Sequence, residues 1–505
     1  MKNTLKFVLL ASSLIISSTS TFAQTVAAPP EPIMPLPAKR HLIYDQEEMR
    51  LFVHFGVNTY TDMEWGDGTE NPEIFQPTKL DTDQWAKVAK ETGFGTIVLT
   101  AKHHDGFALW NSAYTDHDVG SSSWRRGRGD VVGDLEVSTK KYDLGMGLYL
   151  SPWDQNADVY GTDAYNGFYM GQLNELLSNY GELREFWFDG AKGPNVKEMN
   201  YKFETYWSMI RQKQPHAVLF SDAGPDVHWI GNEHGHAKPT NWSGYNMETS
   251  VGGPWVPELT YGSENGQYWT PGECNVSIRK GWFNHQDQPA KTTERLMEIY
   301  YKSAGRNCFV LINVPPNKDG LFDDRDVTAL YEFKAARDKV FMTNFTRAAN
   351  IYPTNQRAGD DEYSPNKLVD RDRESYWATD NGIKQAQIVF NMTREHEFNV
   401  VRLSEPIRMG QRIKSYEVEA MINSQWTVIA KGTTIGRKRL HTFKPVTTQN
   451  LRLRILDSKG TILLSEFGVH YDPMLPANYD QLDPDSENMQ DGETHLLHRT
   501  TDTDR

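Results

Sequence analysis

The stretch Phe186-Trp187-Phe188-Asp189-Gly190 places a carboxylate directly after three consecutive aromatic residues. A short apolar run that ends at glycine is typical of a buried strand. Because an apolar strand has no structural use for a terminal aspartate, Asp189 is a candidate functional residue. The structural alternative is a cap, in which the carboxylate accepts hydrogen bonds from backbone N–H groups of the following turn.

Further strand candidates surround this one. Between about residues 48 and 340, short apolar runs alternate with segments of helical period, which is typical of repeated βα units. The strand candidates are 51–55, 96–100, 146–150, 186–189, 218–221 and 309–313. The helix candidates are 85–92, 165–180 and 203–211, and Gly93 and Gly181 follow the first two as C-terminal caps. The pattern alone fits a doubly wound sheet or a (β/α)8 barrel.

The polar residues decide between these two folds. His54, Tyr149, Asp189 and the segments 100–104 and 221–222 all lie at the carboxyl ends of predicted strands. A barrel collects its active site from several strands at that end. No Gly-x-Gly-x-x-Gly follows the first strand, so a dinucleotide-binding fold has no support. The sequence therefore predicts an α/β fold with a (β/α)8-like barrel.

The hydrophobic pattern of the sequence changes after about residue 342. Short alternating strands replace helical periods and predict an antiparallel β-sandwich, with candidates at 387–390, 400–403, 416–420, 426–429, 451–456 and 466–470. The predicted domains are a catalytic barrel over residues 24–341 and a sandwich over 342–472. We expect the acidic, polar residues 473–505 to be disordered.

The N-terminus has the layout of a secretory signal peptide over residues 1–23. Lys2 and Lys6 precede an apolar run at 7–16, and small residues end at Ala23. This run is shorter than the ~18 residues that a membrane-spanning helix needs, and no later run approaches that length. We therefore expect an exported protein, periplasmic or secreted, that does not associate with a membrane.

Composition narrows the class of partner. The 505 residues carry a net charge of -14, and 12% are aromatic, including 14 tryptophans. An acidic chain lacks the basic stripe of a nucleic-acid binder. Surfaces rich in tryptophan and tyrosine suit sugar binding, although these residues are equally common in protein cores. Cys274 and Cys308 either pair or stay free, and the apolar run 307–312 favours a buried core thiol at Cys308.

The histidines raise the question of a metal ion. His54, His103 and His104 at strand ends look like hydrogen-bond donors that converge on hydroxyls. Adjacent side chains point to opposite sides of a strand, so His103 and His104 are not expected to share a metal if their segment is a strand. His234 and His236 form an H-x-H pair, as in zinc hydrolases, but they lie in a polar, glycine-containing loop without H-E-x-x-H. We expect no metal and no other cofactor.

The carboxylates offer a catalytic pair. Glycoside hydrolysis typically uses two carboxyl groups, one that protonates the leaving oxygen and one that attacks or activates water. Asp189 at a strand end and Glu233 in the loop 229–233 after the next strand are favoured by position. Glu64 competes with Glu233 as the acid, and the residues alone leave this choice open.

Six motifs in order resemble the α-L-fucosidases of glycoside hydrolase family 29. They cover about residues 45–340 and are His54-Phe55-Gly56, Glu64-Trp65-Gly66, Lys102-His103-His104-Asp105-Gly106-Phe107, Trp187-Phe188-Asp189-Gly190, Gly231-Asn232-Glu233 and Asn313-Val314-Pro315-Pro316-Asn317. The resemblance implies a (β/α)8-like barrel and a retaining enzyme that forms a covalent fucosyl-aspartate. By position it implies that Asp189 is the nucleophile. It also implies a set of fucose-binding residues: His54, Glu64, Trp65, His103, His104, Tyr149 and Trp282.

The acid/base differs between branches of that family. The segment 224–233 resembles the branch that cleaves α-1,3 and α-1,4 fucosyl links in branched glycans, where the glutamate matching Glu233 is the acid/base. Glu64 then binds or supports. That branch usually carries arginine immediately before the position of Trp229, where this chain has His228.

The C-terminal region resembles the discoidin-like module often attached to these enzymes, through the segments 370–378 and 405–413. Such modules bind sugar or buttress the barrel, and the need for aromatic core residues favours the structural role. The expected substrate is a fucosylated oligosaccharide or glycoconjugate with terminal α-1,3/1,4-linked fucose. The alternatives are a metal-dependent barrel hydrolase and a sugar-binding protein without catalysis, and the presence of both Asp189 and Glu233 counts against the second.

Overall fold

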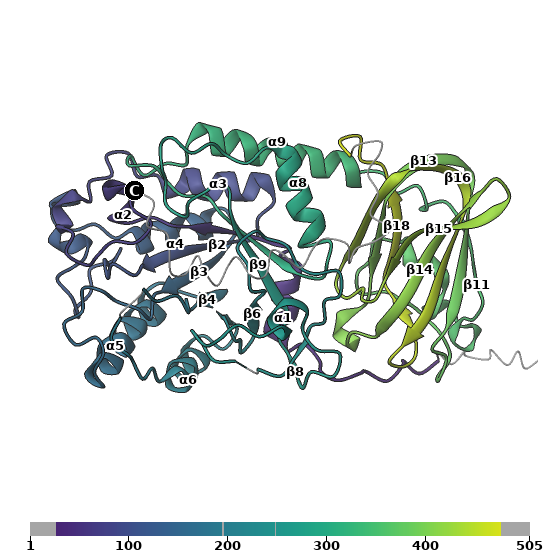
Figure 1. Cartoon of the computed structure of the whole chain (residues 1–505), viewed down its shortest axis with the longest axis horizontal. Coiled ribbons are helices and arrows are strands. Elements are labelled where there is room, and N and C mark those ends of the chain that lie inside the picture. Colours follow the sequence, from purple (N-terminus) through teal and green to yellow (C-terminus); the bar gives the residue numbers. More distant parts are fainter. Residues whose placement is uncertain (1–26, 194–195, 248, 476–505) are drawn as a thin grey trace, which may run out of the picture.

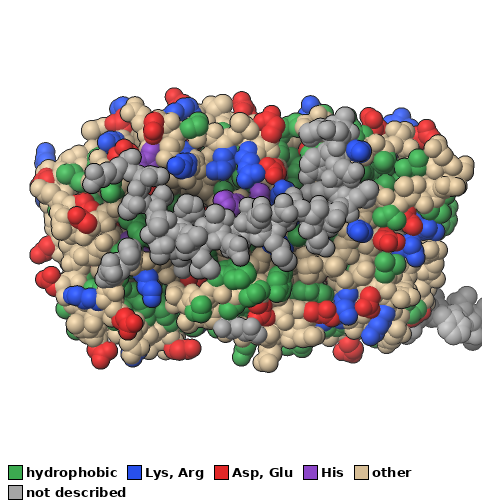
Figure 2. Space-filling model, in the orientation of Figure 1, with side chains coloured by type: hydrophobic (Ala, Val, Ile, Leu, Met, Phe, Trp, Pro, Cys, Tyr) green, Lys and Arg blue, Asp and Glu red, His purple; other side chains and the backbone are tan. Residues whose placement is uncertain are grey.

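The computed structural model describes residues 27–193, 196–247 and 249–475, which form two domains side by side (Figure 1). The predicted signal peptide, and all but the first three residues of the predicted tail, lie outside the described residues. Within the described ranges, no helix is long and apolar enough to cross a membrane. Acidic and basic side chains are interspersed over the face of both domains seen in Figure 2.

The first domain is a closed barrel of parallel strands, as the sequence predicts. Its strand order is β1-β10-β9-β6-β5-β4-β3-β2. The bounds are β1 (Met49–Val53), β2 (Thr96–Lys102), β3 (Gly145–Leu150), β4 (Glu185–Trp187), β5 (Val218–Ser221), β6 (Val227–Trp229), β9 (Gly272–Ser277) and β10 (Phe309–Asn313). The fold-class prediction of a (β/α)8-like barrel is therefore confirmed.

Helices cover the outside of this barrel (Figure 1). The longer ones are α3 (Thr82–Thr92), α4 (Val131–Lys141), α5 (Ala164–Asn179), α6 (Phe203–Lys213), α8 (Thr293–Lys302) and α9 (Asp324–Phe341). Three short ones are α1 (Lys39–Gln46), α2 (Asn58–Thr61) and α7 (Glu258–Tyr261). Gly93 ends α3 at φ 88, the left-handed conformation expected of a glycine cap.

Two barrel strands, β6 and β9, were missed by the sequence predictions. β6 is three residues long and follows β5 without an intervening helix. β9 reads Gly-Glu-Cys-Asn-Val-Ser, in which polar residues alternate with apolar ones. The loop with Glu233 therefore follows β6, and placing it directly after β5 was wrong. The repeat of strand and helix fails between β5 and β6, where the chain pairs two parallel strands without a crossover helix.

Aromatic side chains fill the inside of the barrel. Phe52, Tyr149 and Trp187 belong to one buried cluster. Trp187 stacks on Phe220 with ring centroids 4.1 Å apart and on Tyr149 at 5.3 Å. Because side chains alternate along a strand, the neighbours of these residues face the helices instead. The filled centre separates the two ends of the barrel.

The amino end of the barrel is closed by a buried ionic group, the floor cluster, formed by Tyr44, Arg50, Glu185 and Glu273. The exposed fraction of all four is 0%. The guanidinium carbon of Arg50 lies 3.0 Å from the centroid of the Tyr44 ring, and its Nε lies 3.6 Å from Glu185 Oε2. The Tyr44 hydroxyl contacts both carboxyls.

The second domain is the predicted antiparallel β-sandwich. Its main sheet has the order β11-β13-β16-β14-β15, with β18 paired to β13 and a second sheet of β12 and β17. The bounds are β11 (Asn350–Pro353), β12 (Trp377–Ala378), β13 (Ala386–Ser404), β14 (Ile413–Ile422), β15 (Gln425–Gly432), β16 (Arg439–Ser458), β17 (Leu463–Leu464) and β18 (Glu466–His470). β13 runs through two of the short strands predicted, 387–390 and 400–403, and its pairing with β16 shifts register between Asn391 and His396.

The sandwich docks on the amino end of the barrel. Asp45, at the end of α1, accepts hydrogen bonds from Arg437 Nε at 2.5 Å and from Arg373 Nη2 at 2.8 Å. Lys438 pairs with Glu48 beside β1. The segment 27–33 crosses the sandwich before the barrel begins, since Arg412 Nη2 donates to Glu31 O at 2.7 Å. The contacts of 27–33 are therefore with the sandwich, although the predicted boundary counts it with the barrel.

Cys274 and Cys308 form a disulfide. Parallel pairing of β9 with β10 places Cys274 opposite Val310 and brings the two cysteine Cα atoms to 6.1 Å. The expectation of a core thiol at Cys308 was therefore wrong. The apolar run predicted its burial correctly, but the partner lies on β9, the strand that the sequence did not reveal.

Candidate active site

Strand ends bring the candidate residues together at the carboxyl end of the barrel. His54 follows β1, His103 and His104 follow β2, Tyr149 lies in β3 and Asp189 follows β4. The loop after β6 carries Glu233, and the loop after β9 carries Trp282. This is the end at which barrels gather functional side chains.

Asp189 is held by contacts on both carboxylate oxygens. Its Oδ2 accepts a hydrogen bond from the Tyr149 hydroxyl at 3.0 Å and lies 3.6 Å from His104 Nε2. Its Oδ1 accepts from the backbone N–H of Ala191 at 2.7 Å. The capping role and the functional role therefore coexist, because one oxygen fixes the turn while the other faces the site. The side chain keeps 22% exposure, so a ligand can reach it.

The three histidines form one cluster. The ring centroids of His103 and His104 are 4.1 Å apart, and those of His54 and His103 are 5.4 Å apart. The sequence argument placed His103 and His104 on different sides only if their segment is a strand, and both lie beyond the end of β2. β2 ends at Lys102, and its register with β3 shifts between Thr100 and Lys102, so extended geometry does not continue through the histidines.

All three histidines are neutral at pH 7. Burial lowers the pKa of His54 to about 3 and that of His104 to about 4, and it holds the pKa of His103 well below its usual value. Desolvation penalises the charged imidazolium. A neutral imidazole has one N–H donor and one acceptor nitrogen, and its partners decide which is which.

The partners assign the acceptor nitrogen in two of these rings. His104 Nδ1 lies 2.7 Å from the Ser151 hydroxyl, whose single hydrogen is donated to Trp153 O at 2.6 Å. His104 Nδ1 is therefore the donor, which leaves Nε2 as acceptor. His54 Nδ1 lies 2.9 Å from Asn313 Oδ1, an oxygen that only accepts. Both histidines thus offer an acceptor Nε2 to ligand hydroxyls, whereas the sequence suggested donors.

Glu64 is fixed by two neighbours. His285 Nε2 lies 2.6 Å from one carboxylate oxygen, and the backbone N–H of Trp282 donates to the other at 2.8 Å. The hydrogen bonds that His285 donates to the carboxylates of Glu64 and Asp62 raise the pKa of His285 to about 9, so His285 is a cation at pH 7. Both oxygens of Glu64 are engaged as acceptors, which suits a binding group better than a proton donor. Sequence reasoning missed His285, which lies three residues after Trp282.

Two tryptophans line the site. Trp65 is 37% exposed and stands edge-on to His104, with centroids 5.6 Å apart. Trp282 lies 5.2 Å from the His54 ring, and its Nε1 donates to Glu233 Oε2 at 3.2 Å. Trp282 therefore contacts both acid candidates, Glu64 through its backbone and Glu233 through its side chain. This double contact was not predicted from the sequence.

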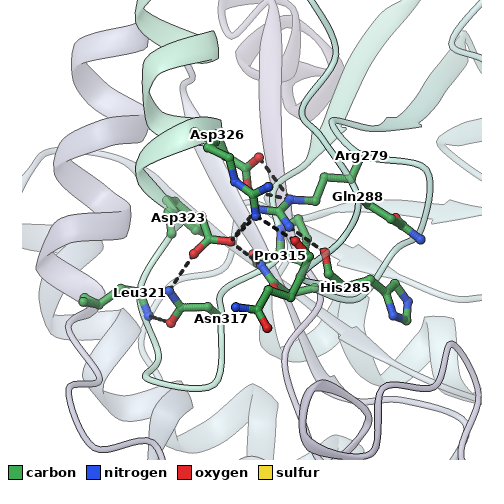
Figure 3. A network of polar contacts seen from close by, with 12 residues as sticks. Arg279, His285, Gln288, Pro315, Asn317, Leu321, Asp323 and Asp326 are labelled. Carbon is green, nitrogen blue, oxygen red and sulfur yellow. Dashed lines mark hydrogen bonds and ion pairs between the residues drawn. The ribbon is translucent and has the colours of Figure 1, made fainter.

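A buried ionic network holds the loop that carries Trp282 and His285 (Figure 3). Arg279 pairs with Asp326 through Nε at 3.0 Å and donates to His285 O through Nη1 at 2.9 Å. Asp323 accepts from Asn317 Nδ2 at 2.8 Å. The motif at 313–317 thus ties the loop after β10 to the loop after β9.

His228, where the fucosidase branch usually has arginine, lies outside the site. Its ring nitrogens lie 2.8 Å from Thr270 O and 3.1 Å from Leu259 O, and its ring stacks on Tyr245. Because both ring nitrogens of His228 contact backbone carbonyls, this side chain has a structural role. The difference at this position therefore leaves the residues around Asp189 unchanged.

No group of three or more His, Cys, Asp or Glu side chains within residues 27–193, 196–247 and 249–475 is arranged to hold a metal ion. His234 and His236, the pair considered for zinc, lie in the loop after β6. Asn232 Oδ1 accepts from the backbone N–H of His234 at 3.1 Å, which folds this loop back on itself.

Comparison with known proteins identifies relatives for both domains. A family model described as alpha-L-fucosidase matches residues 38–335, and one described as F5/8 type C domain matches residues 351–467. Alpha-L-fucosidase 1 of Arabidopsis thaliana is 43% identical over 91% of this chain and 92% of its own length. A putative alpha-L-fucosidase 1 of Oryza sativa is 45% identical over 88% of this chain and 86% of its own.

Solved structures agree. A Ruminococcus gnavus GH29 fucosidase in complex with fucose is 33% identical, with a TM-score of 0.83 over 89% of this chain and 98% of that one. A putative alpha-L-fucosidase from Bacteroides thetaiotaomicron is 34% identical, with a TM-score of 0.83 over 88% of this chain and 99% of that one. Both likenesses extend through barrel and sandwich.

Proposed function

Because this chain belongs to the α-L-fucosidase family of glycoside hydrolases, we propose that it retains anomeric configuration, with Asp189 as nucleophile and Glu233 as acid/base. The observation that carries this proposal is the position of the two carboxyls around one site. Asp189 is oriented by Tyr149, and Glu233 is bound by Trp282.

The first step forms a covalent intermediate. Ionised Asp189 attacks the anomeric carbon while the bond to the leaving oxygen breaks, and Glu233 gives its proton to that oxygen. In the second step Glu233 takes a proton from water, which attacks the same carbon and releases fucose together with the carboxylate of Asp189. Retention through this route requires the carboxyls to be roughly 5 to 5.5 Å apart in the reacting complex.

The surrounding residues bind the sugar in this proposal. The acceptor nitrogens of His54 and His104 take hydrogen bonds from fucose hydroxyls, and Glu64 does the same through its carboxylate. His103, Trp65 and Trp282 complete the pocket around the ring. Neutral histidines suit this task because they add no charge that would compete with the oxocarbenium-like transition state.

We further propose that the substrates are fucosylated oligosaccharides or glycoconjugates with terminal α-1,3 or α-1,4-linked fucose. The likeness of residues 224–233 to that branch and the Trp282 contact of Glu233 support this specificity. We also propose export to the periplasm or the medium. The disulfide of Cys274 and Cys308 supports it, because disulfides persist in oxidising compartments.

The mechanism is tested with an aryl α-L-fucoside and two variants. We expect Asp189→Ala to lose more than about 10³-fold in kcat/KM, because the nucleophile is gone. Azide should then attack the α-fucoside directly and give the β-L-fucosyl azide. In Glu233→Ala, azide should instead attack the fucosyl-aspartate and give the α-L-fucosyl azide.

The controls separate this mechanism from its alternatives. Glu204→Ala, an exposed carboxylate on α6, should keep wild-type activity. Inactivation by a chelator would favour a metal-dependent hydrolase, and full activity of Asp189→Ala would remove that residue from the mechanism. Hydrolysis of α-1,2-linked but not α-1,3/1,4-linked trisaccharides would refute the linkage proposal alone.

A further inference from the structure

One loop packs on both the segment that follows the proposed nucleophile and the loop that carries the proposed acid. It joins β7 (Gly244–Tyr245) to α7. Its Gly252 donates a backbone hydrogen bond to Asp222 Oδ2 at 3.1 Å. A Cβ placed on Gly252 would lie 3.0 Å from Gly190 O, so the loop packs directly on the residue that follows Asp189.

The same loop reaches the acid side three residues later. A Cβ placed on Gly231 would lie 2.5 Å from Trp255 Nε1, so the indole rests on the Gly231 backbone, two residues before Glu233. Gly231 has φ +83, which only glycine adopts readily. Three residues span at most about 11 Å, so the backbone of Trp255 lies within that distance of Gly252, which packs on Gly190.

Trp255 leaves much of its ring in water at this position. Its exposed fraction is 39%, close to the 37% of Trp65. The two exposed tryptophans flank different groups. Trp65 stands against His104, next to Asp189, whereas Trp255 stands against the loop of Glu233. An exposed indole held on a rigid backbone is a ready surface for an apolar ligand face.

We propose that Trp255 is the platform on which the sugar that carries the fucosyl group packs, so that this residue selects branched glycans over simple fucosides. The proposal rests on the retaining mechanism with Glu233 as acid. Glu233 must lie at the glycosidic oxygen to protonate it, and the leaving sugar is bonded to that oxygen. This sugar therefore starts beside the loop of Glu233, within reach of Trp255, while fucose occupies the side of Asp189 and Trp65.

The test compares three substrates that differ only in the leaving group. A fucosylated trisaccharide offers a sugar ring to stack. Methyl α-L-fucoside also needs protonation by the acid but offers no ring, and α-L-fucosyl fluoride needs little help from an acid. The variants are Trp255→Ala, Trp255→Phe as the conservative change, and Tyr352→Ala as a control at a 60% exposed aromatic in the sandwich.

We expect Trp255→Ala to lower kcat/KM about tenfold for the trisaccharide and less than twofold for the other two substrates, with Trp255→Phe in between. Tyr352→Ala should change nothing. Equal losses on trisaccharide and methyl fucoside would show that Trp255 acts through Glu233 and would overturn the proposal. So would unchanged trisaccharide activity. If wild type cleaves the fluoride but Glu233→Ala still cleaves the methyl fucoside, the assignment of the acid fails instead.

Discussion

Glu185 and Asp189 lie four residues apart on one chain segment and point to the same inner side of the barrel, yet their surroundings differ. Glu185 opens β4 at the amino end, is fully buried and faces Arg50 and Tyr44. Asp189 lies about 13 Å further along the barrel, with 22% exposure and an oxygen on Tyr149. Burial raises the pKa of Glu185 well above the ordinary value.

Arg50 in β1 and His54, the residue after β1, repeat this contrast. Arg50 lies in the floor cluster with all of its surface covered, and His54 faces the site with an acceptor nitrogen. The same inward positions of the same strands therefore serve stability at one end and ligand binding at the other. The depth along the barrel decides the role, because Asp189 keeps 22% exposure at the carboxyl end whereas Glu185 and Arg50 are fully buried at the amino end.

The largest test of this contrast is Arg50→Met, which should destabilise the buried amino end of the barrel. The Tyr44 hydroxyl has one hydrogen and two carboxyl neighbours, so the floor cluster already holds a proton at one carboxyl. Removing the cation leaves the remaining buried carboxylate without a counter-charge, which costs about 3–5 kcal/mol of the free energy of unfolding at pH 7. Chemical denaturation at several pH values measures this loss.

The sign of the pH dependence follows from the raised pKa values of Glu185 and Glu273. The folded state binds protons that the unfolded chain releases above pH 4.5, so stability falls as pH rises. Without Arg50 this fall should steepen, and the loss should be larger at pH 8 than at pH 5. Arg347→Met, an exposed arginine, is the matched control. A loss of equal size at both pH values would mean that Arg50 acts only by packing on Tyr44.

A smaller effect is expected at the junction of the two domains. Asp45→Ala removes the acceptor of both Arg437 and Arg373, and the exposed fraction of Arg437 is only 4%. Leaving a buried guanidinium without its carboxylate should cost about 2–3 kcal/mol. We expect calorimetry to show the sandwich melting before the barrel, whereas aryl fucoside hydrolysis at 25 °C stays unchanged because the site lies at the opposite end. Loss of activity without loss of stability would contradict this separation.

The sequence predicted this arrangement in part. The alternation of strand and helix, with polar residues at strand ends, predicted the barrel and the end at which His54, Tyr149 and Asp189 meet. These signals are local, since each comes from one strand and the turn after it. The pairing of β6 and β9 with their neighbours depends on residues far apart in the sequence. In β9, polar residues that face the barrel interior alternate with apolar ones, so the segment lacks the apolar run of a buried strand.

Contacts between segments far apart in the sequence were also not predicted. Glu64 and His285 are separated by more than two hundred residues, and nothing near either one indicates the other. The acceptor state of His104 depends on where the Ser151 hydroxyl sends its hydrogen, which only the folded backbone decides. Histidine donors were therefore inferred where the network provides acceptors.

The smallest effect is expected at the carboxyl end of the barrel, where titration of His285 should change the affinity for fucose. His285 holds Glu64 as a cation, and its pKa is raised from 6.5 to about 9. The ion pair is therefore fully present below pH 6.5 and is lost as pH rises through about 9. We expect the Kd of fucose, measured by calorimetry, to rise about two- to fivefold between pH 7 and pH 10, because an ion pair that is still partly open to solvent contributes little.

His285→Gln isolates this contribution, because glutamine can still donate to Glu64 but does not titrate. Its Kd for fucose at pH 7 should match that of wild type at pH 10, and it should stay flat between these values. Binding of fucose itself does not require the proton of the acid, so the readout separates Glu64 from Glu233. If the Kd of the His285→Gln variant still rises between pH 7 and pH 10, another group titrates in this range. Fucose binding by Glu64 would then not depend on the charge of His285.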